Sequence, residues 1–390
     1  MCVATVNREG RKRPALEPVK KMTSTDSSRT HTRVQSLDYL RGLMALAVMV
    51  YHYVSGSVGD LGSDSVLGRL GIYAVSVFYI LSGVSLAIVY ADGLRSGADV
   101  VDFAIRRLFR IFPLFYVVVT SALLLAWASD IVHGTPHAFP LYKALLNYTL
   151  TFGFVDPSAY LSTGAWSIGN EIVFYALFPW LFLGVTRRSP RVPLALVLSL
   201  VIATWFAFFA LSADTPIELQ WSHYINPFNQ VFLFLAGVAI GTRLMPRPGL
   251  QVRMAVVVLA CVALFCLWPA SGNQIQLVTG LTRVVLSSAC IALVAAVFVW
   301  NPSSDSPVMK PLAFLGEGCY SIYLLHPIVA MPIVFVFSRL HIGSIGAAYC
   351  TAFVATLVLS WLSFRFIEKP MIRAGRTISA RAIGGLRTAS

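Results

Sequence analysis

Long apolar runs alternate with short polar segments along most of the chain. A helix needs about 20 mostly apolar residues to cross a bilayer. Ten runs of about this length can be found, at 37–55, 69–90, 108–128, 161–184, 192–212, 224–243, 253–270, 277–299, 319–339 and 346–367. The pattern predicts an all-α polytopic membrane bundle of about ten transmembrane helices, which occupies residues 37–370.

The composition agrees with this class of protein. Of the 390 residues, 57% are hydrophobic and only 12% are charged, so the chain is far more apolar than a soluble domain. Residues 1–36 are polar and basic, cannot bury a core, and are predicted to form a disordered cytoplasmic N-terminus. Residues 371–390 are predicted to form a basic cytoplasmic tail.

The positive charges predict the orientation. If the N-terminus is cytoplasmic, 25 of the 30 Lys and Arg residues fall on the cytoplasmic side. We therefore expect both termini in the cytoplasm. The net charge of +13 then reflects topology, and no nucleic-acid partner is expected.

Metal binding is not expected. Five of the six cysteines lie in apolar runs, and none forms a Cys-x-x-Cys motif. His133 and His137 are four residues apart, but Gly134 and Pro136 between them favour a loop over a helix that would direct both rings at one ion.

The first apolar run, LDYLRGLMALAVMVYHY, carries two costly polar residues, Arg41 and His52. They are eleven residues apart, which is three helical turns plus about 20°, so both point the same way and lie about 16 Å apart along the axis. A snorkelling Arg and an independent interfacial His are the alternative. The aligned pair favours a polar stripe that links an anion-binding cation to a possible base.

Two further segments add charge near this stripe. Arg107 and Arg110 share a face at the cytoplasmic mouth of the third run and suit phosphate groups, although ordinary positive-inside residues would look the same. Glu171 in TGAWSIGNEIVFY lies near mid-membrane and needs a partner. We expect that partner to be His52, whose tautomer a carboxylate could hold; a structural pairing with Tyr or Trp is the alternative.

The remaining candidates are uncharged or histidine residues. Ser82 and Gly83 lie at mid-membrane, where a backbone amide could stabilise an oxyanion or small residues could simply pack helices. In GEGCYSIYLLHPIVA, Pro327 predicts a bend after His326, and Tyr323 could donate hydrogen bonds in the same cavity. A core histidine bound to a carbonyl is an equally good interpretation of His326.

In order along the chain, the segments LDYLRGLMALAVMVYHY, FYILSG, RRLFRIFPLFY, WSIGNEIVFY, YSIYLLHP and FIEKP resemble acyltransferase family three, the integral-membrane O-acyltransferases. The resemblance covers residues 37–370. It implies a bacterial inner-membrane enzyme that moves an acyl group, commonly acetyl, from cytoplasmic acyl-CoA to a hydroxyl of a glycan, a lipid-linked sugar or a glycosylated metabolite. Larger members carry an esterase-like domain that this sequence does not show, so we expect direct acylation of the acceptor.

The resemblance implies roles for Arg41 and His52 in catalysis, for Arg107 and Arg110 near the acyl donor, and for Glu171 in the membrane site. Together with the residue patterns above, it leads to the following expectations. His52, Glu171 and Arg41 are expected to be catalytic. Acyl-CoA is expected to lie against Arg107, Arg110, Arg41, Ser82 and Gly83, and the sugar acceptor against Tyr323, His326 and Trp166. His52 would act as general base, and an acyl-histidine intermediate stays open. The alternative function is a solute or proton-coupled transporter, since buried Glu, His and Arg also form proton relays.

Overall fold

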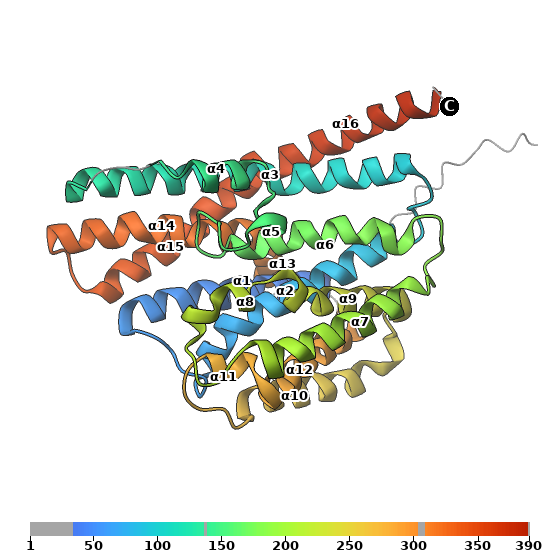
Figure 1. Ribbon diagram of the computed structural model, residues 1–390, viewed down its shortest axis with the longest axis horizontal. Coiled ribbons are helices and arrows are strands. Elements are labelled where there is room, and N and C mark those ends of the chain that lie inside the picture. The colour runs from blue at the N-terminus through green and yellow to red at the C-terminus, as the bar shows by residue number, and fades with distance from the viewer. Residues whose placement is uncertain (1–33, 136–138, 303–308, 389–390) are drawn as a thin grey trace, which may run out of the picture. The chain divides into compact units, whose positions relative to one another are not determined.

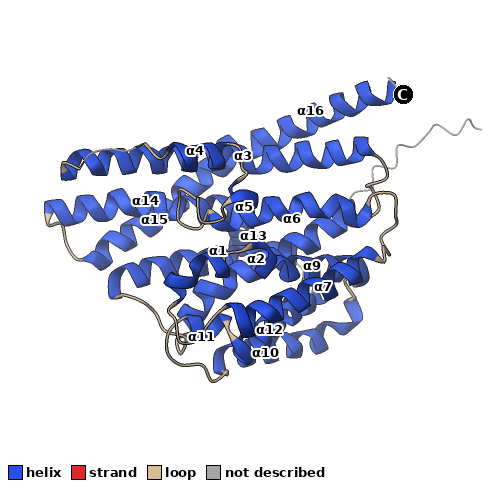
Figure 2. Ribbon diagram, viewed as in Figure 1, coloured by secondary structure: helices blue, strands red, loops and turns tan. Residues whose placement is uncertain are grey.

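The computed structural model describes residues 34–135, 139–302 and 309–388. All regular secondary structure in these ranges is helical, as Figure 2 shows. The predicted all-α class is therefore correct. The prediction of disorder for the N-terminus falls almost wholly on residues outside the described ranges.

Sixteen α-helices and four short π or 3-10 helices follow one another along these ranges (Figure 1). The long helices are α1 (Gln35–Val58), α2 (Val66–Tyr90), α3 (Gly97–His133), α6 (Trp166–Phe182), α7 (Arg191–Trp205), α9 (Pro227–Arg243), α10 (Gln251–Leu267), α12 (Gly280–Trp300), α14 (Cys319–Leu340), α15 (Ile345–Ser363) and α16 (Lys369–Thr388). The short elements are α4 (Leu141–Tyr148), α5 (Phe152–Val155), η1 (Phe206–Ala210), η2 (Ile217–Gln220), α8 (Trp221–Tyr224), η3 (Pro248–Leu250), α11 (Ile275–Val278), α13 (Met309–Glu317) and η4 (Phe364–Glu368).

Every predicted span overlaps a helix, but fewer helices meet a strict criterion for crossing a membrane. Six are long and apolar enough among the described residues, or seven if the pair Ile217–Tyr224 and Pro227–Arg243, bent by 58°, counts as one span. The helices α1, α6 and α10 fall short of the criterion. In α1 the reason is its polar residues, which include Asp38, Arg41 and His52. The number of ten crossings and the cytoplasmic position of both termini stay predictions.

The helices differ in how much of their apolar surface is covered. In the most apolar window of α2, 72% of the residues are buried inside the protein, against 28% in α3. Large apolar side chains such as Val201 and Leu259 are 64% and 68% exposed. In water such an apolar surface would favour aggregation, whereas in a bilayer it contacts lipid tails. The structure thus places α2 at the centre of a bundle whose outer helices face lipid.

Glycines allow α2 and α9 to pack at backbone contact. A Cβ added at Gly83 would lie 2.1 Å from the carbonyl oxygen of Phe234, and one at Gly237 would lie 2.0 Å from that of Ile80. Gly237 and Gly241 are four apart on the same face of α9. Small residues at this spacing let membrane helices approach closely. This contact fixes the position of α2, on which part of the candidate site lies.

The longest described helix, α3, begins earlier than its apolar run. Ser96 and Asp99 form a capping box that starts the helix at Gly97, so Arg106, Arg107 and Arg110 lie on a continuous helix. The C-terminal segment, expected as a tail, forms α16 and packs along α3 (Figure 1). A Cβ at Gly375 would touch Phe109, and Ser379 donates a hydrogen bond to Asp102.

Candidate active site

One face of α1 carries both polar residues toward other helices, as the spacing predicts. The Arg41 guanidinium contacts Asp38 at 2.8 Å and donates hydrogen bonds to the Leu81 carbonyl at 3.3 Å and to Ser85 on α2. Its side chain is 20% exposed. Arg41 is therefore fixed between α1 and α2 and does not snorkel freely.

His52 faces α14 and meets His326 there. Its Nδ1 lies 3.0 Å from His326 Nε2 and 3.0 Å from the Val48 carbonyl oxygen, and the two ring centroids are 5.0 Å apart. The two residues are 274 positions apart in the chain. The predicted partner of His52 was Glu171, so this histidine pair corrects that prediction.

Backbone carbonyls decide the tautomers of this pair. His326 Nδ1 lies 3.3 Å from the Ile322 carbonyl oxygen, and a carbonyl only accepts, so that nitrogen carries the hydrogen. In a neutral ring Nε2 is then an acceptor, and it receives the hydrogen of His52 Nδ1, which also faces Val48. The remaining nitrogen, His52 Nε2, keeps its lone pair. The arrangement gives one imidazole a fixed orientation and a free basic nitrogen.

Pro327 and Tyr53 help to hold His326. Proline has no N–H, so the Tyr323 carbonyl lacks its usual helical donor and stays available to the His326 ring, which bonds the Ile322 carbonyl oxygen at 3.3 Å. From α1, the Tyr53 hydroxyl donates to the His326 carbonyl at 2.9 Å and lies 2.9 Å from Thr356 Oγ1 on α15. His326 is fully buried. Tyr53 thus ties the backbone at His326 to α1 and α15, and the buried, carbonyl-bound ring matches the core histidine that the sequence analysis gave as the alternative to acceptor binding.

Glu171 bonds Tyr175, as in the alternative that the sequence analysis left open, and not His52. Its Oε1 accepts hydrogen bonds from Ser82 at 2.6 Å and from Tyr175 at 2.5 Å. Neither of these two hydrogen bonds involves His52. Ser82 and Ser85 are one turn apart on α2, so Glu171 and Arg41 bind neighbouring positions of the same helix. The carboxylate therefore belongs to the arginine end of the site.

Arg107 and Arg110 lie at this same end, and Arg107 has an unused hydrogen-bond donor. Arg107 donates only a long bond of 3.4 Å to the Tyr90 hydroxyl, its cation lies over the Tyr90 ring, and its buried Nε has no acceptor among the described residues. Arg110 interacts electrostatically with Glu368 and Glu171. Arg107 therefore has an unused donor for an anionic ligand, whereas Arg110 lies within the influence of two carboxylates.

Two residues of this end escaped sequence reasoning. Glu368, 2% exposed, accepts a hydrogen bond from Ser321 on α14, while its Oε2 has no partner among the described residues. Cys319 lies within electrostatic reach of Arg41, Arg110 and Glu368. The motif FIEKP, which contains Glu368, was a signal that could have been used. The π-helix η4 that turns this carboxylate inward was not visible in the pattern.

Of the predicted acceptor residues, His326 belongs to the histidine pair, while Tyr323 and Trp166 lie near the start of α6. The Tyr323 hydroxyl lies 2.9 Å from Ser167 Oγ and 3.0 Å from the Gly164 carbonyl, next to the start of α6. Trp166, 6% exposed, packs edge-on against Trp221. Gly83, predicted beside the donor, instead lies against the backbone of α9.

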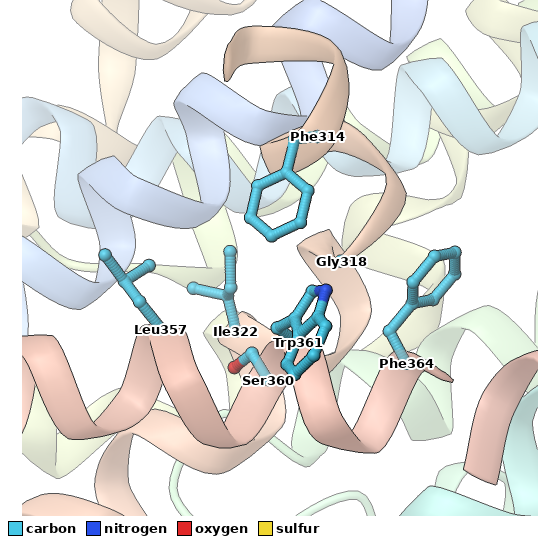
Figure 3. A pocket seen from close by; sticks show the side chains of 7 residues that line it. All are labelled: Phe314, Gly318, Ile322, Leu357, Ser360, Trp361 and Phe364. Carbon is cyan, nitrogen blue, oxygen red and sulfur yellow. The ribbon is translucent and has the colours of Figure 1, made fainter. Parts of the chain in front are cut away.

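The cavity in Figure 3 lies apart from this polar arrangement. It has a volume of about 10 Å³, room for little more than a water, and is lined mostly by apolar groups of α13, α14, α15 and η4. Its one side-chain oxygen, Ser360 Oγ, has no hydrogen-bond partner in the described part of the chain. Such a space could not hold an acyl donor. Among the described residues, no group of three or more His, Cys, Asp or Glu side chains is placed to hold a metal ion.

Comparison with known proteins identifies the family. Residues 34–365 match the model of an acyltransferase domain, the third acyltransferase family. The chain is 26% identical to the putative peptidoglycan O-acetyltransferase YrhL of Bacillus subtilis over 90% of its length, and 25% identical to the peptidoglycan O-acetyltransferase OatA of Listeria monocytogenes over 88%. It is 24% identical to the exopolysaccharide production protein ExoZ of Rhizobium meliloti over 81%.

The relatives differ in length. The chain covers 57% of YrhL and 56% of OatA but 94% of ExoZ, so it spans little more than half of the first two. No solved structure matches. Because the family model covers most of the chain, and the motifs that match lie on the helices described above, the chain belongs to the membrane acyltransferase family three.

Proposed function

We propose that this chain is an O-acetyltransferase that moves an acetyl group from acyl-CoA to a hydroxyl of a glycan. Two relatives are named peptidoglycan O-acetyltransferases and a third is named for exopolysaccharide production, which supports acetyl as the group and a sugar polymer as the acceptor. The lipid-facing helices support a multi-pass membrane protein. The cell membrane is its proposed location.

The observation that carries the proposal is the free Nε2 of His52. Its ring is held by a neighbouring histidine whose own tautomer is fixed by carbonyls, which is the arrangement that a general base requires. Arg41 lies on the same helix, with its backbone about 16 Å away from that of His52 along the axis at the usual rise per residue. One helix thus links a basic nitrogen to a cluster of cations.

The donor is proposed to bind at the arginine end. Phosphate oxygens of acyl-CoA would bind Arg107 and Arg110, since guanidinium groups bind phosphate through two parallel hydrogen bonds. Arg41 would lie where the pantetheine arm enters the bundle. Glu171 and Glu368 act here as positioning residues that hold Tyr175 and Arg110. We propose that this end opens to the cytoplasm, the side that the positive charges predict.

The proposed acetyl transfer uses His52, the acceptor hydroxyl and the thioester of the donor. His52 Nε2 removes the proton of the acceptor hydroxyl, and the oxygen attacks the thioester carbonyl. The carbon–sulfur bond breaks, and the thiolate of CoA leaves and takes up the proton from the imidazolium. General-base assistance of this kind contributes typically about 10²–10⁴-fold to the rate. The acceptor would approach from the side of Tyr323 and Trp166.

The test uses purified protein in proteoliposomes with acetyl-CoA that carries a labelled acetyl group. Peptidoglycan fragments and exopolysaccharide oligomers are supplied as acceptors, and label is measured on the glycan. We expect transfer by the native protein and its loss in His52→Ala. His341→Ala, which removes an exposed histidine at the end of α14, is the matched control and should transfer normally.

The donor site is tested in the same system. Replacing Arg107 and Arg110 together with Ala should raise the KM for acetyl-CoA with a smaller effect on kcat. Label that accumulates inside the vesicles without reaching any glycan would favour the transporter instead. Full transfer by His52→Ala would refute the base, and an unchanged KM in the double variant would move the phosphate site elsewhere.

A further inference from the structure

Two arginines outside the candidate active site are buried, and they differ in how their charge is satisfied. Arg69, 3% exposed, donates to the carbonyl oxygens of Ser63, Phe265, Cys266 and Trp268 at 2.7–3.0 Å. Three of these carbonyls belong to the C-terminal end of α10, the negative end of the helix dipole. Arg69 is thus a fully bonded helix cap.

Arg283 lacks this compensation. It is 5% exposed and donates one hydrogen bond, of 2.8 Å, from Nη2 to the Asn229 carbonyl oxygen. Its cation lies 5.8 Å from the centre of the Phe232 ring, and its Nη1 has no acceptor among the residues that the structure describes. Within the described residues no carboxylate forms an ion pair with it. An unpaired buried charge is costly, so a counter-charge is expected.

The helix ends next to Arg283 increase the positive electrostatic potential around it. Arg283 is the fourth residue of α12 and Gln230 is the fourth residue of α9, so both lie at the positive end of a helix dipole. Both side chains line a cavity of about 10 Å³. Helix N-termini are ordinary binding sites for anions because their N–H groups lack intrahelical acceptors. The N-terminal ends of α9 and α12 and the buried guanidinium of Arg283 therefore lie at the same small cavity.

The cavity walls carry hydroxyl groups and no acid, although the Tyr73 hydroxyl already donates its hydrogen to the Leu277 carbonyl oxygen at 2.6 Å. The other polar residues that line it are Ser76 of α2, Ser287 of α12, Tyr73 and Tyr224, each no more than 6% exposed. The remaining lining residues are apolar. A volume near that of one water admits a single-atom occupant and excludes phosphate or acetate.

From this arrangement we infer a site for a monovalent halide, chloride under ordinary conditions, bound between α2, α9 and α12. The anion neutralises Arg283 and receives hydrogen bonds from the hydroxyls of Ser76, Ser287 and Tyr224. Because the three helices each contribute to the site, the anion stabilises the bundle by linkage, without a part in acetyl transfer.

The experiment measures the melting temperature of the detergent-solubilised protein in sodium chloride, sodium bromide and sodium gluconate at equal ionic strength. We expect a saturable increase of a few degrees with either halide and none with gluconate. In Arg283→Met the halide response should disappear, whereas Arg69→Met should be less stable but keep the response. In Ser287→Ala, a milder change, the response should move to higher halide concentration.

Bromide in place of chloride also gives a direct signal, an anomalous diffraction peak beside Arg283. A water that bridges Arg283 to Asn229 would give neither the peak nor the halide response. Equal melting temperatures in chloride and gluconate, or a halide response that survives in Arg283→Met, would overturn the site. Since acetyl transfer is not measured, these results are independent of the proposed function.

Discussion

At the scale of single residues, the polar side chains were visible in the sequence but their partners were not. His52, His326, Glu171 and Arg41 all stood out because ionisable groups are rare at membrane depth. The structure joins His52 to His326 and leaves Glu171 with Ser82 and Tyr175. Each histidine is anchored locally by a carbonyl four residues earlier in its own helix, Val48 or Ile322.

This pairing predicts a graded effect at position 326. His326→Ala removes the acceptor of the His52 Nδ1 hydrogen, so kcat should fall by roughly 10²-fold, the lower end of what a general base contributes, with little change in the KM for acetyl-CoA. His326→Gln offers an amide oxygen in place of Nε2 and should recover part of the rate. Steady-state kinetics with melting temperatures would check both variants. A Gln variant no better than Ala would contradict the positioning role.

At the scale of elements, apolar runs predicted where the helices are, and local chemistry decided how they are used. The capping box at Ser96 and Asp99 extends α3 beyond its apolar run, because caps and not hydrophobicity start a helix. Close contact through Gly83 and Gly237 sets the place of α2 against α9. The glycines could be identified in the sequence, but the helix against which each of them packs could not be predicted.

Pro327 has a testable effect on α14, which stays one helix through Pro327 and Pro332. In Pro327→Ala the new N–H would bond the Tyr323 carbonyl and compete with His326 for it. We expect equal or greater stability, since proline inside a helix costs about 3 kcal/mol, together with a lower kcat. Pro332→Ala changes the same helix away from the histidine pair, so its kcat should stay near the native value. Equal rates in the two variants would argue against the carbonyl contact.

At the scale of the whole molecule, the distribution of Lys and Arg predicts which way the protein is oriented in the membrane. The arrangement of the helices alone does not. Most of the Lys and Arg residues fall on one side if the N-terminus is cytoplasmic. The arginine end of the candidate site, with Arg107 and Arg110, is then the cytoplasmic end. A donor from the cytoplasm and an acceptor from the opposite side would meet at His52.

This orientation can be measured with a membrane-impermeant thiol reagent in a cysteine-free background. Arg95→Cys lies in the segment before α3, and Asp214→Cys lies in the segment before η2; both positions are exposed. We expect labelling at 214 in intact cells and labelling at 95 only after permeabilisation. The reverse pattern would invert the proposed access of donor and acceptor.

The sequence by itself determined the helical class, the positions of most long helices and the ionisable residues within the apolar runs, because helical period and transfer of side chains into lipid are local properties of the chain. Only the tertiary structure decided which helix faces which, and therefore that His52 meets His326, that Glu171 binds at the arginine end, and that Arg283 is buried without an acid. Those outcomes depend on contacts between residues far apart in the chain, such as 52 and 326. They follow from helix rotation and glycine-mediated packing, which one helix's pattern does not specify.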